Sequence, residues 1–150
     1  FQFLIQLKQT KQNKMRPINK VLIHCSATPK GRDDKAKDIK EWHLAKGWSD
    51  VGYHFIIELD GKTVKGRPID VLGAHCRGYN KFSIGICYIG GMDENMDRPQ
   101  DTRTEAQKKS LVKLVNKLKK QFPNISIHGH NEFSNKACPS FSVADEFTSK

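Results

Sequence analysis

Histidine and cysteine side chains stand near the ends of apolar runs, where the fold could bring them together. His24 lies in the first such run, and His128 and His130 close the last one. Because side chains alternate along a strand, His128 and His130 are expected on the same face. Cys138 follows eight residues after His130, in a segment long enough to turn back. If the first and last strands are neighbours in a sheet, His24, His130 and Cys138 converge at one edge.

Two imidazoles and a thiolate are ligands that suit zinc. A catalytic zinc takes three protein ligands and keeps its fourth position for water, whereas magnesium and calcium favour carboxylate oxygens. The H-x7-C spacing of His130 and Cys138 is not a recognised metal signature. Scattered histidines also occur as surface residues or as hydrogen-bonded core groups. Spacing alone therefore leaves both a zinc site and a purely structural role open.

Other motifs that carry chemistry are absent from the sequence. It contains no GxxxxGK[ST] phosphate loop, no GxSxG nucleophile elbow, no HExxH zinc motif and no GxGxxG dinucleotide motif. Its four cysteines are far apart and include no CxxC pair: Cys25, Cys76, Cys87 and Cys138. We expect reduced thiols in a cytosolic protein rather than a disulfide framework.

The composition indicates one soluble domain with an anionic partner. The chain has 150 residues, a net charge of +10 and 37% hydrophobic residues. No apolar run approaches the roughly 20 residues that a membrane-spanning helix needs, so no membrane span is expected. The basic excess fits nucleic acid, a lipid headgroup surface or an acidic polymer such as bacterial cell wall.

Basic residues are concentrated in two parts of the chain. Residues 1–20 carry five of them and no acid, and we interpret this stretch as a poorly ordered extension that precedes a folded domain over 21–150. The residues before Met15 show no secretion signal. Around the helix predicted over 102–122, no aromatic residues interleave with the charges, so we expect a solvated face and no specific nucleic-acid binding. The residues of this expected face are Arg103, Lys108, Lys109, Lys113, Lys117, Lys119 and Lys120.

The hydrophobic pattern predicts a single mixed α/β domain, with a central mixed β-sheet flanked by helices. In chain order we expect a strand over 21–25, a helix over 33–47, a hairpin of 53–59 and 62–64, a strand over 84–89, a helix over 102–122, a strand over 125–127 and a helix near 143–147. Asp33 or Asp34 is expected to cap the first helix, in which Trp42 continues the apolar stripe. The pattern Thr102-x-x-Glu105 predicts a capping box at the long helix.

Six sequence blocks occur in one order along the chain. They are HCSAT at 24–28, W-x5-W-x-D-VGYHFII at 42–57, DGKTVKGR at 60–67, AH-x-x-GYN at 74–80, SIGIC at 83–87 and H-x5-KACPSF at 130–141. Together these blocks closely resemble the zinc-dependent N-acetylmuramoyl-L-alanine amidases of the phage-lysozyme type, in the superfamily of type 2 amidases and peptidoglycan recognition proteins. The resemblance runs from about residue 21 to residue 147.

The resemblance implies a role for seven residues. It places one zinc ion per chain on His24, His130 and Cys138, and it gives catalytic roles to Tyr53 and Lys136. His75 and Asn80 match positions that line the substrate groove in similar proteins. Relatives that only bind peptidoglycan usually lack the cysteine, and this chain has it.

The implied reaction is hydrolysis of the amide between N-acetylmuramic acid and L-alanine in peptidoglycan. Tyr53 would orient water or pass on its proton, and Lys136 would stabilise the oxyanion. The resemblance further suggests a phage or prophage endolysin that is monomeric and stays in the cytoplasm until it is released to the cell wall. Two other functions stay open: a module that binds muropeptides without cutting them, and a regulatory protein that inhibits RNA polymerase.

Overall fold

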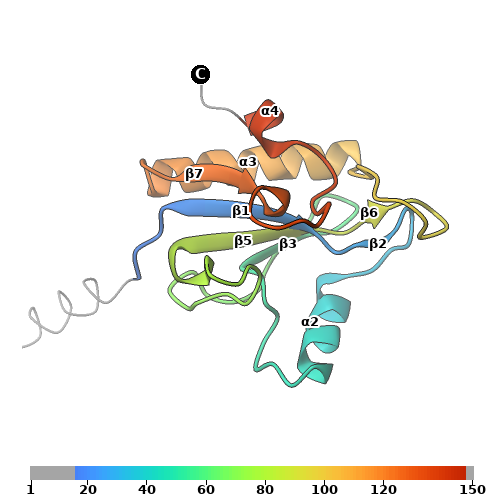
Figure 1. Cartoon of the computed structure of the whole chain (residues 1–150), viewed down its shortest axis with the longest axis horizontal. Coiled ribbons are helices and arrows are strands. Elements are labelled where there is room, and N and C mark those ends of the chain that lie inside the picture. The colour runs from blue at the N-terminus through green and yellow to red at the C-terminus, as the bar shows by residue number, and fades with distance from the viewer. Residues whose placement is uncertain (1–15, 148–150) are drawn as a thin grey trace, which may run out of the picture.

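The computed structural model describes residues 16–147 and consists of a central sheet with helices on both sides (Figure 1). The sheet has the strand order β4-β3-β5-β1-β7. Its strands are β1 (Lys20–Cys25), β3 (Phe55–Ile57), β4 (Thr63–Lys65), β5 (Ser83–Tyr88) and β7 (Ser126–Gly129). Two short strands, β2 (Thr28–Pro29) and β6 (Gly91–Met92), form a separate parallel pair. The predicted mixed α/β class is confirmed.

The central strands are parallel and buried on both faces. β1 pairs in parallel with β5 on one side and with β7 on the other, so the first and last strands are neighbours as the sequence argument required. β3 lies parallel to β5 and antiparallel to β4, and the connection turns at Asp60-Gly61. Strands covered on both faces read as continuous apolar runs, which explains the pattern of β1 and β5.

Helices cover the two faces of the sheet. They are α2 (Ala36–Ala45), α3 (Glu105–Gln121) and α4 (Val143–Phe147), with short 3-10 helices η1 (Asn80–Phe82) and η2 (His130–Glu132). α3 packs Leu111, Val115 and Leu118 against one face, and α2 packs Ala36 and Ile39 against the other. No helix within residues 16–147 is long and apolar enough to cross a membrane.

Both helix caps differ from the sequence predictions. α2 begins after Lys35, whose backbone N–H donates to the Asp38 carboxylate, and neither predicted aspartate is the cap. α3 begins after Thr104, whose hydroxyl accepts from the backbone N–H of Gln107 at 3.0 Å. The predicted cap Thr102 instead accepts a hydrogen bond from the backbone N–H of Gly91 at 2.8 Å. Because the Thr102 hydroxyl bonds to β6, it does not cap the helix.

Several residues before the predicted domain start at residue 21 contact the rest of the described structure. β1 begins at Lys20, and the Arg16 guanidinium donates to the backbone oxygens of Ile69 and Ser83 at 2.8 and 2.9 Å. These bonds connect the segment before β1 to the loop between β4 and β5 and to the first residue of β5. Most of the predicted basic extension, residues 1–15, lies outside the described residues.

Arg103 does not belong to the solvated face predicted for the long helix. Its side chain is 2% exposed and forms ion pairs with Asp101 and Glu146 at 2.9 and 2.6 Å. The guanidinium also lies over the Phe141 ring, 3.5 Å from the ring centre. Arg103 therefore connects the start of α3 to α4 and to the loop that precedes α4.

Candidate metal centre

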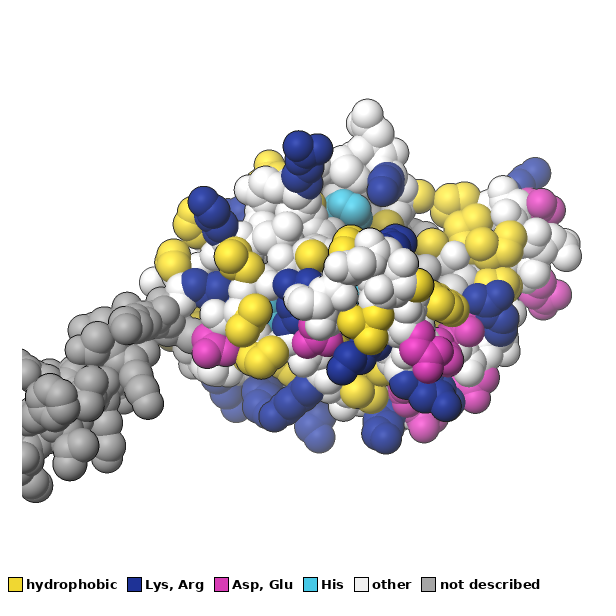
Figure 2. Space-filling view, turned by 90° about the horizontal axis from the view of Figure 1, so that it is seen from below, with side chains coloured by type: hydrophobic (Ala, Val, Ile, Leu, Met, Phe, Trp, Pro, Cys, Tyr) yellow, Lys and Arg dark blue, Asp and Glu magenta, His cyan; other side chains and the backbone are white. Residues whose placement is uncertain are grey.

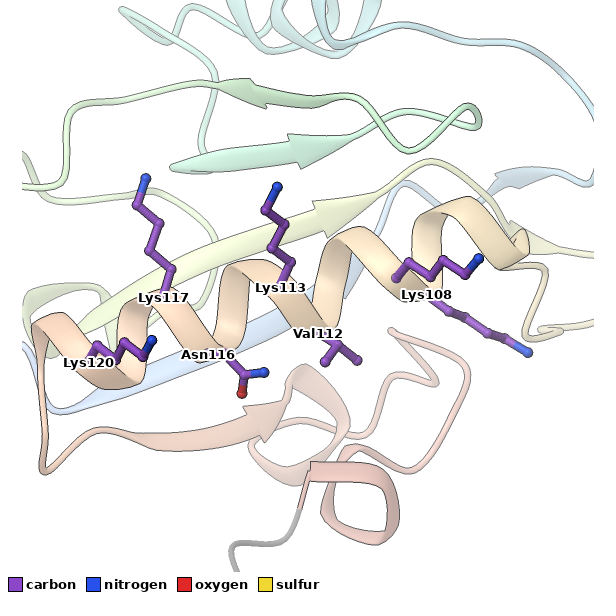
Figure 3. Close-up of a pocket in the computed structure, with 7 residues that line it drawn as sticks. Lys108, Val112, Lys113, Asn116, Lys117 and Lys120 are labelled. Atoms are coloured by element: carbon purple, nitrogen blue, oxygen red, sulfur yellow. The ribbon is translucent and has the colours of Figure 1, made fainter.

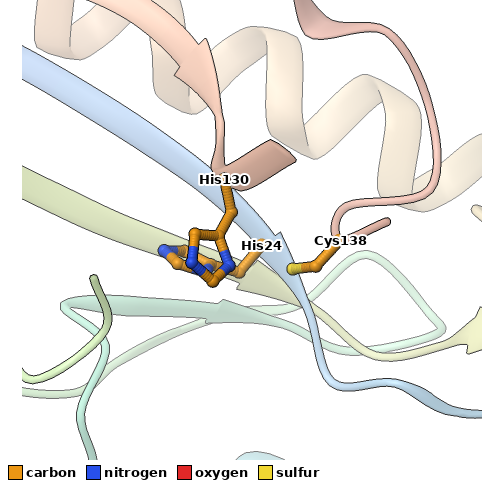
Figure 4. A group of neighbouring side chains, drawn as sticks. All are labelled: His24, His130 and Cys138. Atoms are coloured by element: carbon orange, nitrogen blue, oxygen red, sulfur yellow. The ribbon is translucent and has the colours of Figure 1, made fainter. Parts of the chain in front are cut away.

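His24, His130 and Cys138 come together at the carboxyl ends of β1 and β7 (Figure 4). One ligand atom from each side chain lies within 4.8 Å of the other two. Because β1 and β7 are parallel neighbours, their last residues meet at the same edge, and the loop after η2 returns Cys138 to that edge. The convergence expected of these three residues is therefore found.

His128 does not share the position of His130, contrary to the expectation from strand alternation. β7 ends at Gly129, and the chain then turns into η2, which begins at His130. The His128 ring instead contacts the Glu132 carboxylate at 3.0 Å and the Ser126 hydroxyl at 2.7 Å. Glu132 also accepts from the backbone N–H of Gly129, so it supports the turn and leaves His130 free of that carboxylate.

Cys138 lies in a segment that is fixed by hydrogen bonds to the strands beneath it. The Tyr88 hydroxyl donates to the Pro139 oxygen at 2.6 Å, and the Ser140 hydroxyl donates to the Gly91 oxygen at 2.9 Å. The Cys138 sulfur accepts from the backbone N–H of Cys25 at 3.1 Å. The Cys25 side chain and burial both raise the pKa of the Cys138 thiol, so its thiolate requires a cation nearby.

The two histidines of the group are in the form that binds a metal. Burial, and secondarily His75 and His130, hold the pKa of His24 well below its ordinary value. Burial, followed by the charge of Lys136, lowers the pKa of His130. Neutral imidazole is the ligand form, and two imidazoles with one thiolate match the donor set that zinc prefers. The residues present therefore fit a zinc ion.

A cleft of about 370 Å³ opens over this group and contains both predicted catalytic residues. The Tyr53 ring lies 5.2 Å from the His24 ring, centre to centre, and burial raises the pKa of its phenol well above 10.0, so it is protonated at neutral pH. Lys136 lies at the cleft with an exposed side chain. The cleft thus combines a metal-ligand set, a half-buried proton donor and an exposed cation.

The sequence matches the model of a known protein family over most of its length. Residues 14–141 match the family model described as N-acetylmuramoyl-L-alanine amidase. The chain belongs to this amidase family. The endolysin of Klebsiella phage KP32 is 40% identical over 87% of this chain and 85% of its own length. The endolysin of Escherichia phage T7 is 40% identical over 82% of this chain and 81% of its own length.

The solved structures agree with this assignment. The N-acetylmuramoyl-L-alanine amidase LysC from Clostridium intestinale superposes on this chain with a TM-score of 0.73. It is 27% identical and the match covers 89% of this chain and 83% of that one. The family resemblance inferred from the six sequence blocks is confirmed, and so is the predicted enzyme class, an amide hydrolase that acts on peptidoglycan.

The two residues predicted to bind substrate in this amidase occupy different environments. His75 lines the cleft, but its Nδ1 lies 2.9 Å from Nε2 of His24. The Asn80 side-chain oxygen accepts from the backbone N–H groups of His75 and Cys76, each at 3.0 Å. Asn80 is not among the residues that line the cleft, and its side chain closes the loop that carries His75.

Aromatic residues on α2 and after it form a wall of the cleft that the sequence argument missed. Trp42 was expected in the apolar stripe of the helix, but it is 39% exposed and lines the cleft. Trp48 and His43 pack with ring centres 4.5 Å apart, and His43 Nδ1 accepts from the backbone N–H of Gly52. The W-x5-W block was the available signal, because helical periodicity alone places Trp42 in the core.

A larger hollow of about 780 Å³ lies along the outer surface of α3, away from the metal-ligand set (Figure 3). Lysines line most of it, and Lys113 and Lys117 extend to the same side of the helix. It contains no carboxylate, imidazole or thiol, so size alone does not identify the catalytic cleft. Basic side chains also extend along the lower margin of the molecule in Figure 2. The α3 lysines that line the hollow belong to the solvated face predicted for this helix.

Proposed function

We propose that this amidase is a zinc-dependent endolysin that cleaves the bond between N-acetylmuramic acid and L-alanine. The observation that carries the proposal is the group of His24, His130 and Cys138, with ligand atoms within 4.8 Å of one another at a cleft. The endolysin relatives support a role in cell-wall degradation, because their matches cover most of both chains. A net charge of +10 favours encounter with an anionic wall at low ionic strength.

Three residues would hold the zinc ion, one per chain, and two others would act on the substrate. When bound, zinc supplies a Lewis acid that activates water and polarises the scissile carbonyl. Tyr53 is protonated and lies half-buried beside His24, so its hydroxyl can orient water or a substrate oxygen by donating a hydrogen bond. The Lys136 ammonium supplies positive charge for the oxyanion that develops as the amide is attacked.

The complete donor set favours the enzyme over a module that only binds muropeptides. Recognition alone needs no thiolate beside two imidazoles, and Cys138 has a backbone donor aimed at its sulfur. A monomeric state, a cytoplasmic location before release and an RNA polymerase partner stay predictions from the sequence.

The proposal is tested by comparing the wild-type protein with Cys138→Ser in metal analysis and in cell-wall digestion. We expect about one zinc per wild-type chain, and loss of both zinc and amide cleavage in the variant. Cys76→Ser is the control, since Cys76 is a free cysteine that does not line the cleft. Full cleavage by a metal-free Cys138→Ser protein would overturn the assignment of the ligand set.

A further inference from the structure

A chain of hydrogen bonds extends from His24 into the protein interior. His24 Nε2 lies 2.9 Å from Nδ1 of His75, and His75 Nε2 lies 3.2 Å from the Ser83 hydroxyl. The Ser83 hydroxyl in turn lies 2.7 Å from the backbone oxygen of Tyr79. Since His24 is 1% exposed, water has little access to this end of its ring.

The donor and the acceptor of each hydrogen bond in this series follow from the last acceptor, the backbone oxygen of Tyr79. A carbonyl oxygen only accepts, so the single Ser83 proton goes to Tyr79. The Ser83 oxygen must then accept from His75, which places the proton of a neutral His75 ring on Nε2 and a lone pair on Nδ1. That lone pair accepts from His24, which therefore carries its proton on Nε2 and a lone pair on Nδ1.

We propose that His75 and Ser83 are positioning residues that fix the tautomer and orientation of His24, so that Nδ1 is its metal-binding nitrogen. The inference rests on the proposed zinc site at His24, His130 and Cys138. It changes the role of His75 from a substrate-groove residue to a support for a ligand. Metal-ligating histidines generally donate their second ring N–H to such a partner, and the partner fixes the ring in place.

The packing around His75 supports this role independently of the hydrogen bonds. A Cβ atom on Gly85 would lie 2.6 Å from both Cγ and Cδ2 of His75, and one on Gly73 would lie 2.6 Å from Cδ2. Two glycines therefore make room for the imidazole and confine it at the same time. His54 stabilises this slot, because its Nδ1 accepts from the backbone N–H of Gly85 at 3.0 Å.

The Ser83 end of the hydrogen-bond series is also fixed. Arg16 donates to the backbone oxygens of Asn80 and Ser83 at 3.2 and 2.9 Å. The Asn80 side chain accepts from the backbone N–H of His75, as described above. These contacts fix both ends of the loop from His75 to Ser83, and so they keep the two side chains within hydrogen-bonding distance.

The first test reads the His24 tautomer by nitrogen-15 NMR of the metal-free protein. We expect a protonated Nε2 and an unprotonated Nδ1 in the wild type, and a mixture of tautomers in Ser83→Ala and His75→Ala. A wild-type His24 that is protonated on Nδ1 would overturn the proposal. This readout needs no zinc and no activity, so it separates the hydrogen-bond chain from the proposed function.

The second test measures zinc affinity by competition with a chromophoric chelator. We expect His75→Ala to weaken zinc binding by about 10–100-fold, the usual effect of losing such a partner. His75→Asn should recover part of the loss, because its side-chain oxygen can accept near the position of Nδ1. His128→Ala is the control and should bind zinc like the wild type, since the His128 ring forms hydrogen bonds with the Glu132 and Ser126 side chains rather than with a proposed ligand.

The outcomes distinguish the two proposals. A wild type without zinc affinity overturns the proposed function, whatever the tautomer of His24. A wild type that binds zinc, together with a folded His75→Ala variant of equal affinity, overturns the role of His75 and leaves the ligand set intact. If the histidine variants misfold, Ser83→Ala still tests the hydrogen-bond series, because it removes only one hydroxyl group.

Discussion

Replacement of Arg103 by alanine should destabilise the amidase far more than its place in a lysine-rich segment indicates. The guanidinium donates four hydrogen bonds of 2.6–2.9 Å, two to Asp101 and two to Glu146. It is 2% exposed and lies over the Phe141 ring. The substitution would release α4 and the loop that carries Cys138 from the start of α3.

The magnitude follows from the exposure of the partners. Removing one member of a buried ion pair costs about 3–5 kcal/mol, because the other charge stays buried without a partner. The Asp101 and Glu146 side chains are 32% and 40% exposed, so water can solvate them again after Arg103 is removed. We therefore expect the lower end, about 3 kcal/mol. At about 2–4 °C per kcal/mol for a chain of this size, Tm falls by roughly 6–12 °C.

Urea unfolding followed by far-UV circular dichroism measures this difference. Zinc must be held constant, because a ligand of the native state adds stability by mass action. The matched control is Lys108→Ala, whose ion pair with Glu105 spans 3.5 Å between side chains that are 43% and 84% exposed. Its loss should cost less than about 0.5 kcal/mol. Equal unfolding free energies for Arg103→Ala and Lys108→Ala would refute the reasoning.

The same ion pair predicts a pH dependence. Burial alone would raise the pKa of Asp101, but the hydrogen bonds and charge of Arg103 outweigh burial and lower it below 3.8. A carboxylate with a lowered folded-state pKa stabilises the fold above its unfolded-state value, and this contribution disappears as the pH falls through the folded-state value. The stability gap between wild type and Arg103→Ala should therefore narrow below about pH 4. A gap that widens with acid would contradict this sign.

Three further predictions concern the cleft and its support. Lys136→Ala and Tyr53→Phe should each keep zinc but lose about 10²–10³-fold in kcat, measured as the release of stem peptides. Equal loss of zinc in both variants would count against their catalytic roles. Gly85→Ala should cost about 1–3 kcal/mol in urea unfolding, since its Cβ would overlap the His75 ring, and an unchanged unfolding midpoint would argue against the slot. Deleting residues 1–14 should leave hydrolysis intact, because the residues that line the cleft lie between His24 and Cys138; a folded but inactive truncation would show otherwise.

The order of elements could be predicted from the sequence, because buried parallel strands and an amphipathic helix leave distinct patterns. The ligand set could not be derived from spacing alone and depended on the family resemblance. Strand alternation wrongly placed His128 on the same face as His130, because alternation holds only within the strand, and β7 ends at Gly129, one residue before His130. No local rule reveals that the chain enters η2 there.

The remaining differences arise from contacts between distant parts of the chain. Thr102-x-x-Glu105 and Thr104-x-x-Gln107 both fit a capping box, and the hydrogen bond from Gly91 to Thr102 decides between them. Arg103 looks like a surface residue until Glu146, which is 43 positions away, supplies its second carboxylate. The role of Asn80 in closing its loop likewise depends on three-dimensional proximity.

Mass spectrometry of purified peptidoglycan digested by the zinc-loaded protein tests the central claim most directly. We expect stem peptides with a free L-alanine amino group, glycan strands of unchanged length, and loss of both after removal of the metal by a chelator and recovery with zinc. Shortened glycan strands, cleavage within the stem peptide, or the same products from metal-depleted protein would contradict a zinc-dependent N-acetylmuramoyl-L-alanine amidase built on His24, His130 and Cys138.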